Sequence, residues 1–178
     1  MLTICMEIIK ELEKKCLKDF FFIKGKINLD SEYFIKKIKE GCNSNNNLNF
    51  KTNIKSLMTS FNFFNQDQKF LEILQKFIFY IDDNYDFPQY TLGDSWGLEV
   101  RPNEKTVFHS HQGHVWSGVV YLNSSSQELI FKEINEKIKP EEGSFVLFSP
   151  FLSHGCERNQ DNYSKFGLSF NMKELKNW

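Results

Sequence analysis

The 178-residue sequence has very little arginine, no paired cysteine motif and no long apolar run. Arginine occurs only at Arg101 and Arg158, and 22 basic residues against 23 acidic residues give a formal net charge of -1. A charge so close to zero creates no global field toward nucleic acid or an anionic membrane. We therefore expect no nucleic-acid partner unless a local basic patch provides one.

The four cysteines, Cys5, Cys16, Cys42 and Cys156, form no C-x-x-C pair. The first residues lack the basic stretch, the uninterrupted apolar run and the small-residue cleavage site of a signal peptide. No segment approaches the ~18 consecutive apolar residues of a membrane-spanning helix. These absences predict a reduced, cytoplasmic protein with no membrane partner.

The chain is long enough for one sizeable core, so we expect a single domain over residues 1–178. Residues 1–89 are expected to form a mainly helical buttress, with amphipathic helices at 4–22, 31–40 and 67–83. The Asn-rich segment 42–49 is expected to be a loop. Residues 90–178 are expected to form the core of the domain.

Short β-type runs separated by turn residues dominate the second half. The predicted strands are 95–101, 106–111, 117–122, 128–132, 144–148 and 165–172. Many short strands after a helical segment indicate an α+β fold, namely a jelly roll (double-stranded β-helix, a cupin-like barrel) with the N-terminal helices packed on one side.

All four histidines lie in this second half. His109 and His111 are two residues apart on a predicted strand, so their side chains are expected on the same face. His154 follows the predicted strand 144–148, where the chain can deliver a third imidazole from a neighbouring strand. The pattern predicts a metal site.

Several motifs occur in a fixed order around these histidines. They are Trp96, His109-Ser110-His111, Ser117-Gly118-Val119-Val120-Tyr121, the segment 143–150, His154, and Lys165 leading into Ser169-Phe170-Asn171. In this order the sequence resembles the Fe(II)/2-oxoglutarate-dependent oxygenases, in particular a small bacterial and phage branch of them. The resemblance covers about residues 53–172.

The resemblance implies an enzyme that hydroxylates a substrate while converting 2-oxoglutarate to succinate and CO2. It implies that His109, His111 and His154 bind Fe(II). It assigns the cosubstrate 2-oxoglutarate to Lys165, Tyr121 and Ser169, and the substrate pocket to Trp96, His114, Trp116 and Arg158. Two positions depart from the family: Lys165 stands where Arg is usual, and Gly167 where Ser is common.

Alternatives remain at several points. His114, Glu99 or Asp94 can replace His111 as a ligand, and Cys156 is either a thiol near the metal or a small buried residue. The runner-up function is a cupin-type metal protein that does not use 2-oxoglutarate, and a metal-free jelly roll is a third. The substrate, a small molecule or a peptide, is not identified. A homodimer is one possible oligomeric state. If the protein is encoded by a phage, its expected location is the host cytoplasm.

Overall fold

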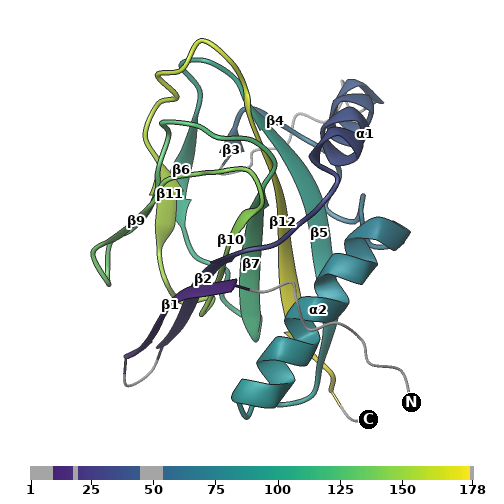
Figure 1. The fold of residues 1–178 in the computed structure, drawn as a ribbon, viewed down its shortest axis with the longest axis vertical. Coiled ribbons are helices and arrows are strands. Elements are labelled where there is room, and N and C mark those ends of the chain that lie inside the picture. Colours follow the sequence, from purple (N-terminus) through teal and green to yellow (C-terminus); the bar gives the residue numbers. More distant parts are fainter. Residues whose placement is uncertain (1–9, 18–19, 45–53, 177–178) are drawn as a thin grey trace.

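The structure, a computed structural model, describes residues 10–17, 20–44 and 54–176. The described chain forms two facing β-sheets, with two helices on the outer side of the larger sheet (Figure 1). The larger sheet has the strand order β1 (Lys10–Leu17), β2 (Phe20–Lys26), β10 (Ser144–Phe148), β7 (Trp116–Tyr121), β12 (Lys165–Glu174), β5 (Tyr90–Val100), β4 (Leu57–Met58). The smaller sheet has the order β3 (Ile54–Lys55), β6 (Lys105–His109), β11 (His154–Cys156), β8 (Leu129–Phe131), β9 (Glu136–Ile138).

Both faces of the larger sheet are buried. Successive side chains of a strand point to opposite faces, so each inner strand contributes to two cores. In β10, Phe145 and Leu147 pack in the core beneath the helices, whereas Val146 and Phe148 pack in the core between the sheets. Strand β7 alternates in the same way. This arrangement is the jelly roll that the strand pattern predicts.

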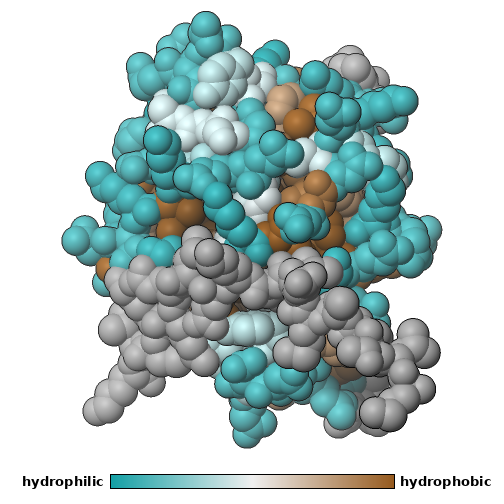
Figure 2. All heavy atoms as spheres, in the orientation of Figure 1, coloured by the Kyte–Doolittle hydropathy of each residue, from teal (hydrophilic) through white to brown (hydrophobic). Residues whose placement is uncertain are grey.

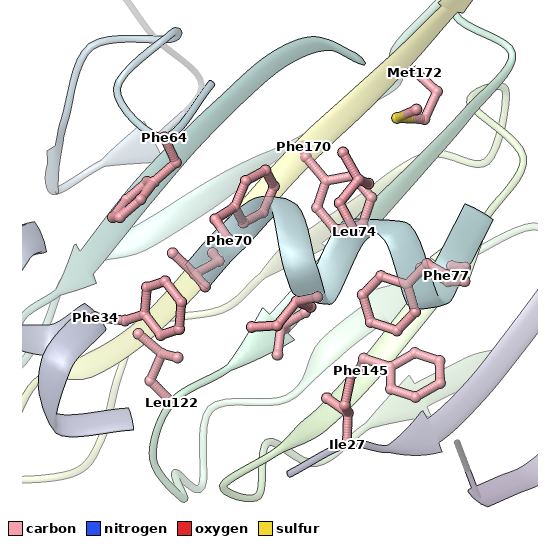
Figure 3. Close-up of a cluster of buried hydrophobic side chains, with 14 of the residues drawn as sticks. Ile27, Phe34, Phe64, Phe70, Leu74, Phe77, Leu122, Phe145, Phe170 and Met172 are labelled. Carbon is pink, nitrogen blue, oxygen red and sulfur yellow. The ribbon is translucent and has the colours of Figure 1, made fainter. Parts of the chain in front are cut away.

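Helix α2 (Gln68–Asn84) covers the outer face of the larger sheet. Figure 3 shows its Phe70, Leu74 and Phe77 clustered with the sheet residues Phe145 and Phe170. The rings of Phe77 and Phe170 stack with centroids 5.9 Å apart. The helix predicted at 67–83 is therefore confirmed, shifted by one residue.

The helix predicted at 4–22 is wrong in its described part. Residues 10–17 and 20–26 form the antiparallel pair β1 and β2, and residues 1–9 and 18–19 lie outside the described residues. Strand β2 is buried on both faces, with Phe21 and Ile23 beneath the helices and Phe22 between the sheets. Such a continuous apolar run has no strand-like alternation to distinguish it from a buried helix.

The helix predicted at 31–40 is present and longer, as α1 (Ser31–Ser44). The first residues of the predicted loop 42–49 are therefore helical, and residues 45–49 lie outside the described residues. No described helix is long and apolar enough to cross a membrane. The face in Figure 2 is largely hydrophilic where it is coloured, with hydrophobic residues gathered near its middle.

All six predicted strands are present, β10 with the predicted bounds and the other five with shifted ends, and six others, β1, β2, β3, β4, β9 and β11, were not predicted. Two of the differences affect the site. Strand β6 ends at His109, so His111 lies in the following loop, and His154 begins a strand of its own, β11.

Candidate metal centre and ligand cavity

Three histidines meet because two strands of the smaller sheet pair and the loop after one of them folds back. Strands β6 and β11 are antiparallel, with His109 directly opposite His154. Beyond His109 the chain turns at Gly113, whose φ of 91° is a left-handed conformation that favours glycine. The backbone N–H of His111 donates to the carbonyl of Pro150 at 2.8 Å, which holds the loop against the segment that leads to β11.

The three imidazoles form a compact group. Their ring centroids are 4.6 Å (His109 to His154), 4.9 Å (His109 to His111) and 5.0 Å (His111 to His154) apart. One nitrogen from each ring lies within 4.8 Å of the others, and Nε2 of His111 is 3.2 Å from Nε2 of His154. Two nitrogens bound at right angles, each about 2.1 Å from one metal, would be about 3 Å apart. The group therefore has the size of a metal site.

Hydrogen bonds to two of the histidines leave their Nε2 atoms available as metal ligands. Nδ1 of His109 donates to the carbonyl of Val107 at 2.8 Å, and Nδ1 of His154 donates to the carbonyl of Leu152 at 2.9 Å. Each bond fixes the tautomer in which Nε2 carries a lone pair, as in metal-binding histidines.

The electrostatic surroundings keep these rings neutral. Burial lowers the pKa of His111 to about 2, helped by repulsion from His154 and His109, and burial lowers the pKa of His154 to about 4. Burial also lowers the pKa of His109. Neutral imidazoles are the form that coordinates a metal. Three such donors converging from one side fit a divalent ion such as Fe(II) and leave room for other ligands opposite.

The imidazoles line one end of a cavity between the sheets, with a volume of about 60 Å³. One water molecule requires about 10–15 Å³ of cavity volume, so several groups of the size of a water molecule fit. The floor of the cavity is the inner face of the larger sheet, where strand register sets the side chains in rows. The successive rows are Asp94, Asn171 and Ser117; Trp96, Ser169 and Val119; Leu98, Gly167 and Tyr121; and Val100 with Lys165.

Lys165 closes the inner end of these rows. Its side chain lines the cavity although the residue is only 5% exposed. Its Nζ lies 3.3 Å from the carbonyl of Gln127 and 3.4 Å from Sγ of Cys156. Among the described residues, no carboxylate lies within 4.0 Å of this ammonium. A buried cation without an acidic partner costs stability, so it needs a functional explanation.

Tyr121 lies beside Lys165 and also lines the cavity, with Nζ of Lys165 5.9 Å from the centre of its ring. Burial, with Cys156 nearby, raises the pKa of Tyr121 well above its ordinary range. The phenol therefore stays protonated near neutral pH and can donate a hydrogen bond. Trp96, one row from Tyr121, is also buried in the wall of the cavity, and its ring contacts Phe61 edge-on.

Other predicted site residues lie elsewhere. Trp116 packs in the core beneath the helices, on the opposite face of the larger sheet, and the exposed Arg158 donates from Nη1 to the carbonyl of Asn103. His114 lies beside the group, its ring centroid 6.4 Å from that of His111 and its Nε2 3.6 Å from Oδ2 of Asp94.

Of the alternative ligands, neither Asp94 nor His114 joins the group of three histidines. The third alternative, Glu99, accepts a hydrogen bond from Ser164 instead. The structure therefore brings His111, and not its proposed replacements, to the other two histidines.

Two polar residues of the cavity had no role in the sequence interpretation. Oγ of Ser117 donates to Oδ1 of Asn171 at 2.7 Å, and both side chains line the cavity. The alternation of strands could have identified them, because Asn171 is in phase with Lys165 and Ser117 is in phase with Tyr121.

No protein-family model and no curated protein matches the sequence. Solved structures do resemble the fold. The viral collagen prolyl hydroxylase of Paramecium bursaria Chlorella virus-1, in complex with 2-oxoglutarate, has a TM-score of 0.70 at 15% identity over 86% of this chain and 96% of its own. A Pseudomonas putida prolyl-4-hydroxylase has a TM-score of 0.67 at 11% identity, covering 87% and 93%.

HygX from Streptomyces hygroscopicus, with nickel and 2-oxoglutarate bound, has a TM-score of 0.64 at 12% identity, covering 88% of this chain and 82% of its own. Identities this low show a shared fold and leave the activity of this chain to its own residues. Together with the strand order, these likenesses show that the chain has the jelly-roll fold of the two hydroxylases and of HygX.

Proposed function

We propose that the protein is a non-haem Fe(II)- and 2-oxoglutarate-dependent dioxygenase that hydroxylates a C–H bond of its substrate. The reaction takes up dioxygen and 2-oxoglutarate and yields the hydroxylated product, succinate and CO2. One observation carries the proposal: three neutral imidazoles and a buried ammonium without an acidic partner line the same cavity. The order of the sequence motifs further supports assignment to the bacterial and phage branch of the family.

Each part of the cavity has a task in this proposal. His109, His111 and His154 hold Fe(II), which supplies Lewis acidity and redox chemistry with dioxygen that side chains lack. Lys165 pairs with the far carboxylate of 2-oxoglutarate, and Tyr121 donates a hydrogen bond to the cosubstrate. Ser169, which the resemblance assigns to the cosubstrate, lies two rows from Lys165 and is not needed for this contact. Leu98 and Gly167, which lie between the two ends, give the middle of the cavity an apolar surface that excludes water.

Succinate release in air, with added Fe(II) and 2-oxoglutarate, tests this function. Slow release is expected without the native substrate. It should be lost in His154→Ala, whereas His114→Ala, which changes a histidine outside the group of three, should keep it. Equal release from both variants and from wild type would remove the basis of the proposal.

A cupin-type metal protein is a second candidate, favoured by a group of three imidazoles that contains no carboxylate. It would bind the metal as tightly but would not respond to 2-oxoglutarate. Anaerobic Fe(II) protein separates the two functions. The oxygenase predicts a weak visible charge-transfer band when 2-oxoglutarate is added, and the cupin predicts none.

A further inference from the structure

The charges in the cavity do not balance once the proposed metal and cosubstrate are bound, and this further inference rests on that proposed function. The three imidazoles are neutral as ligands, and the cavity lining that the structure describes contains Lys165 but no Asp or Glu. A divalent metal and one ammonium make three positive charges. The dicarboxylate of 2-oxoglutarate neutralises two of them and leaves one in a cavity lined mainly by buried and half-buried residues, where an unpaired charge is costly.

Asp94 and Asp161, which interact with residues of the site, do not supply this missing charge. Asp94 pairs with His114 at 3.6 Å, is not among the lining residues, and its side chain is 37% exposed. Asp161 accepts hydrogen bonds from Ser125 and Ser126 and lies more than 4.0 Å from Lys165. The attraction of Lys165 is the smallest of the causes that lower the pKa of Asp161, and hydrogen bonds from Ser126 and Ser125 outweigh it. Solvent screens both part-exposed carboxylates, so neither neutralises a charge inside the cavity effectively.

Two polar side chains that line the same cavity as the imidazoles show where the extra anion can bind. Asn171 is 4% exposed, and its Oδ1 already accepts from Ser117, which leaves the Nδ2 hydrogens as its free polar atoms. Among the described residues, neither this Nδ2 nor the hydroxyl of Ser169 has a hydrogen-bond partner in the structure. Both side chains line the cavity.

The two groups are suitably spaced for one carboxylate. Asn171 and Ser169 are two residues apart on β12 and face the same side, so their Cα atoms are about 6.7 Å apart. Two donors at this separation can reach the two oxygens of a single carboxylate.

We propose that the cavity binds a third negative charge, a carboxylate of the substrate to be hydroxylated, through the Asn171 amide and the Ser169 hydroxyl. The substrate class is therefore an organic acid or a peptide segment that presents a carboxylate. Ser117 is a positioning residue, because its hydroxyl orients the Asn171 amide with the N–H groups away from β7.

Acetate and acetamide are the probes, because they have nearly the same shape and differ in charge. They are titrated in chloride-free buffer against Co(II)-loaded protein saturated with 2-oxoglutarate, and binding is followed by the visible Co(II) spectrum and by calorimetry. We expect acetate to bind at least tenfold more tightly than acetamide. Chloride, which carries the charge without two oxygens, should bind more weakly than acetate.

Asn171→Asp is the decisive variant. It keeps the acceptor for Ser117, removes the N–H donors and places a negative charge in the cavity. Acetate affinity should fall at least tenfold, while Co(II) and 2-oxoglutarate still bind because the three positive charges are then balanced. Ser169→Ala, which loses no hydrogen bond to a described residue, should weaken acetate binding by a smaller factor. Asn162→Asp, the same change at an exposed residue, should have no effect.

The outcomes separate this inference from the function on which it rests. Two results would overturn the third-anion site while the oxygenase proposal stands, provided that wild type binds Co(II) and 2-oxoglutarate. The first is that wild type binds acetate no better than acetamide. The second is that Asn171→Asp binds acetate as tightly as wild type does. Equal binding of acetate and chloride would overturn the carboxylate class. A wild-type protein that binds neither Co(II) nor 2-oxoglutarate would overturn both proposals.

Discussion

Lys165 shows at the scale of a single residue how binding function can oppose stability. Its ammonium is buried against a carbonyl and a thiol, neither of which carries the charge of a carboxylate. Removing a buried, uncompensated charge is often neutral or stabilising for the fold. A ligand that brings its own carboxylate into the cavity would instead gain a charge-assisted hydrogen bond.

Lys165→Met should therefore weaken 2-oxoglutarate binding without lowering the melting temperature. Hydrogen bonds to charged groups contribute about 1.5–3 kcal/mol, so the dissociation constant should rise about 10- to 150-fold. Calorimetric titration of the metal-loaded protein measures it. Lys173→Met removes an exposed lysine from the same strand and is the matched control. Unchanged affinity in Lys165→Met would show that the cosubstrate does not reach this ammonium.

At the scale of the elements, the local pattern of apolar and turn residues predicts those strands that are bounded by turn residues. It fails for strands that are buried because they pair with a segment far away in the sequence. Strand β10 was predicted with its observed bounds, because Gly143 and Pro150 flank it. Strand β2 was not, because it pairs with β10, more than a hundred residues away, and is buried on both faces. No local periodicity encodes such a partner.

The packing of β7 against β12 depends on Gly118. A Cβ added there would lie 2.3 Å from Cζ of Phe170, which is fully packed beneath α2. We expect Gly118→Ala to lower the free energy of unfolding by about 1–3 kcal/mol. Chemical denaturation measures the loss.

Gly167→Ala is the comparison variant, since its added Cβ would face the cavity and meet its nearest atom, the Val120 carbonyl oxygen, at 3.3 Å. It should cost less stability than Gly118→Ala. The reverse order would contradict the packing described for the two faces of the larger sheet.

The start of α2 gives a pH-dependent contribution to stability. Asp67 caps the helix by accepting from the Phe70 amide, and it also accepts from Lys37 and Tyr33. Burial alone would raise the pKa of Asp67, but these hydrogen bonds lower it below its ordinary value. A carboxyl with a lowered folded-state pKa adds stability that is complete above the unfolded pKa of about 3.9 and is lost as the pH falls through the folded pKa.

Asp67→Asn keeps a good helix cap but removes the charge. The variant should be less stable than wild type at about pH 6, and the difference should shrink toward about pH 3 as the wild-type carboxyl takes up its proton. Urea unfolding across this range measures the difference. A difference that is constant with pH would show that the Asp67 charge does not contribute.

At the scale of the whole molecule, the site is assembled from residues of both sheets that are far apart in the sequence. The strand alternation and the family resemblance pointed to His109, His111, His154, Lys165 and Tyr121, and the structure places all five along one cavity. Sequence alone could not exclude Trp116 from it. Trp116 packs against the helices because of how the two sheets and helix α2 pack together, and the sequence of β7 alone does not specify this.

Metal should stabilise the whole fold, because its ligands come from β6, from the loop after it and from β11. A metal at about 100 times its dissociation constant adds about 2.7 kcal/mol. For a chain of this size, this corresponds to a rise of about 5–10 °C in melting temperature. Thermal unfolding with Ni(II) should show the rise in wild type and in His114→Ala but not in His154→Ala. An equal rise in His154→Ala would place the metal elsewhere.

The central claim is that three imidazoles and one buried ammonium hold the two ends of a single metal–cosubstrate unit. A crystal structure grown without oxygen in the presence of Fe(II) and 2-oxoglutarate tests it most directly. The account predicts one ion about 2.1 Å from a nitrogen of each of His109, His111 and His154, and a cosubstrate carboxylate on Nζ of Lys165. An ion bound elsewhere, or a cosubstrate whose far carboxylate does not contact Lys165, would contradict it.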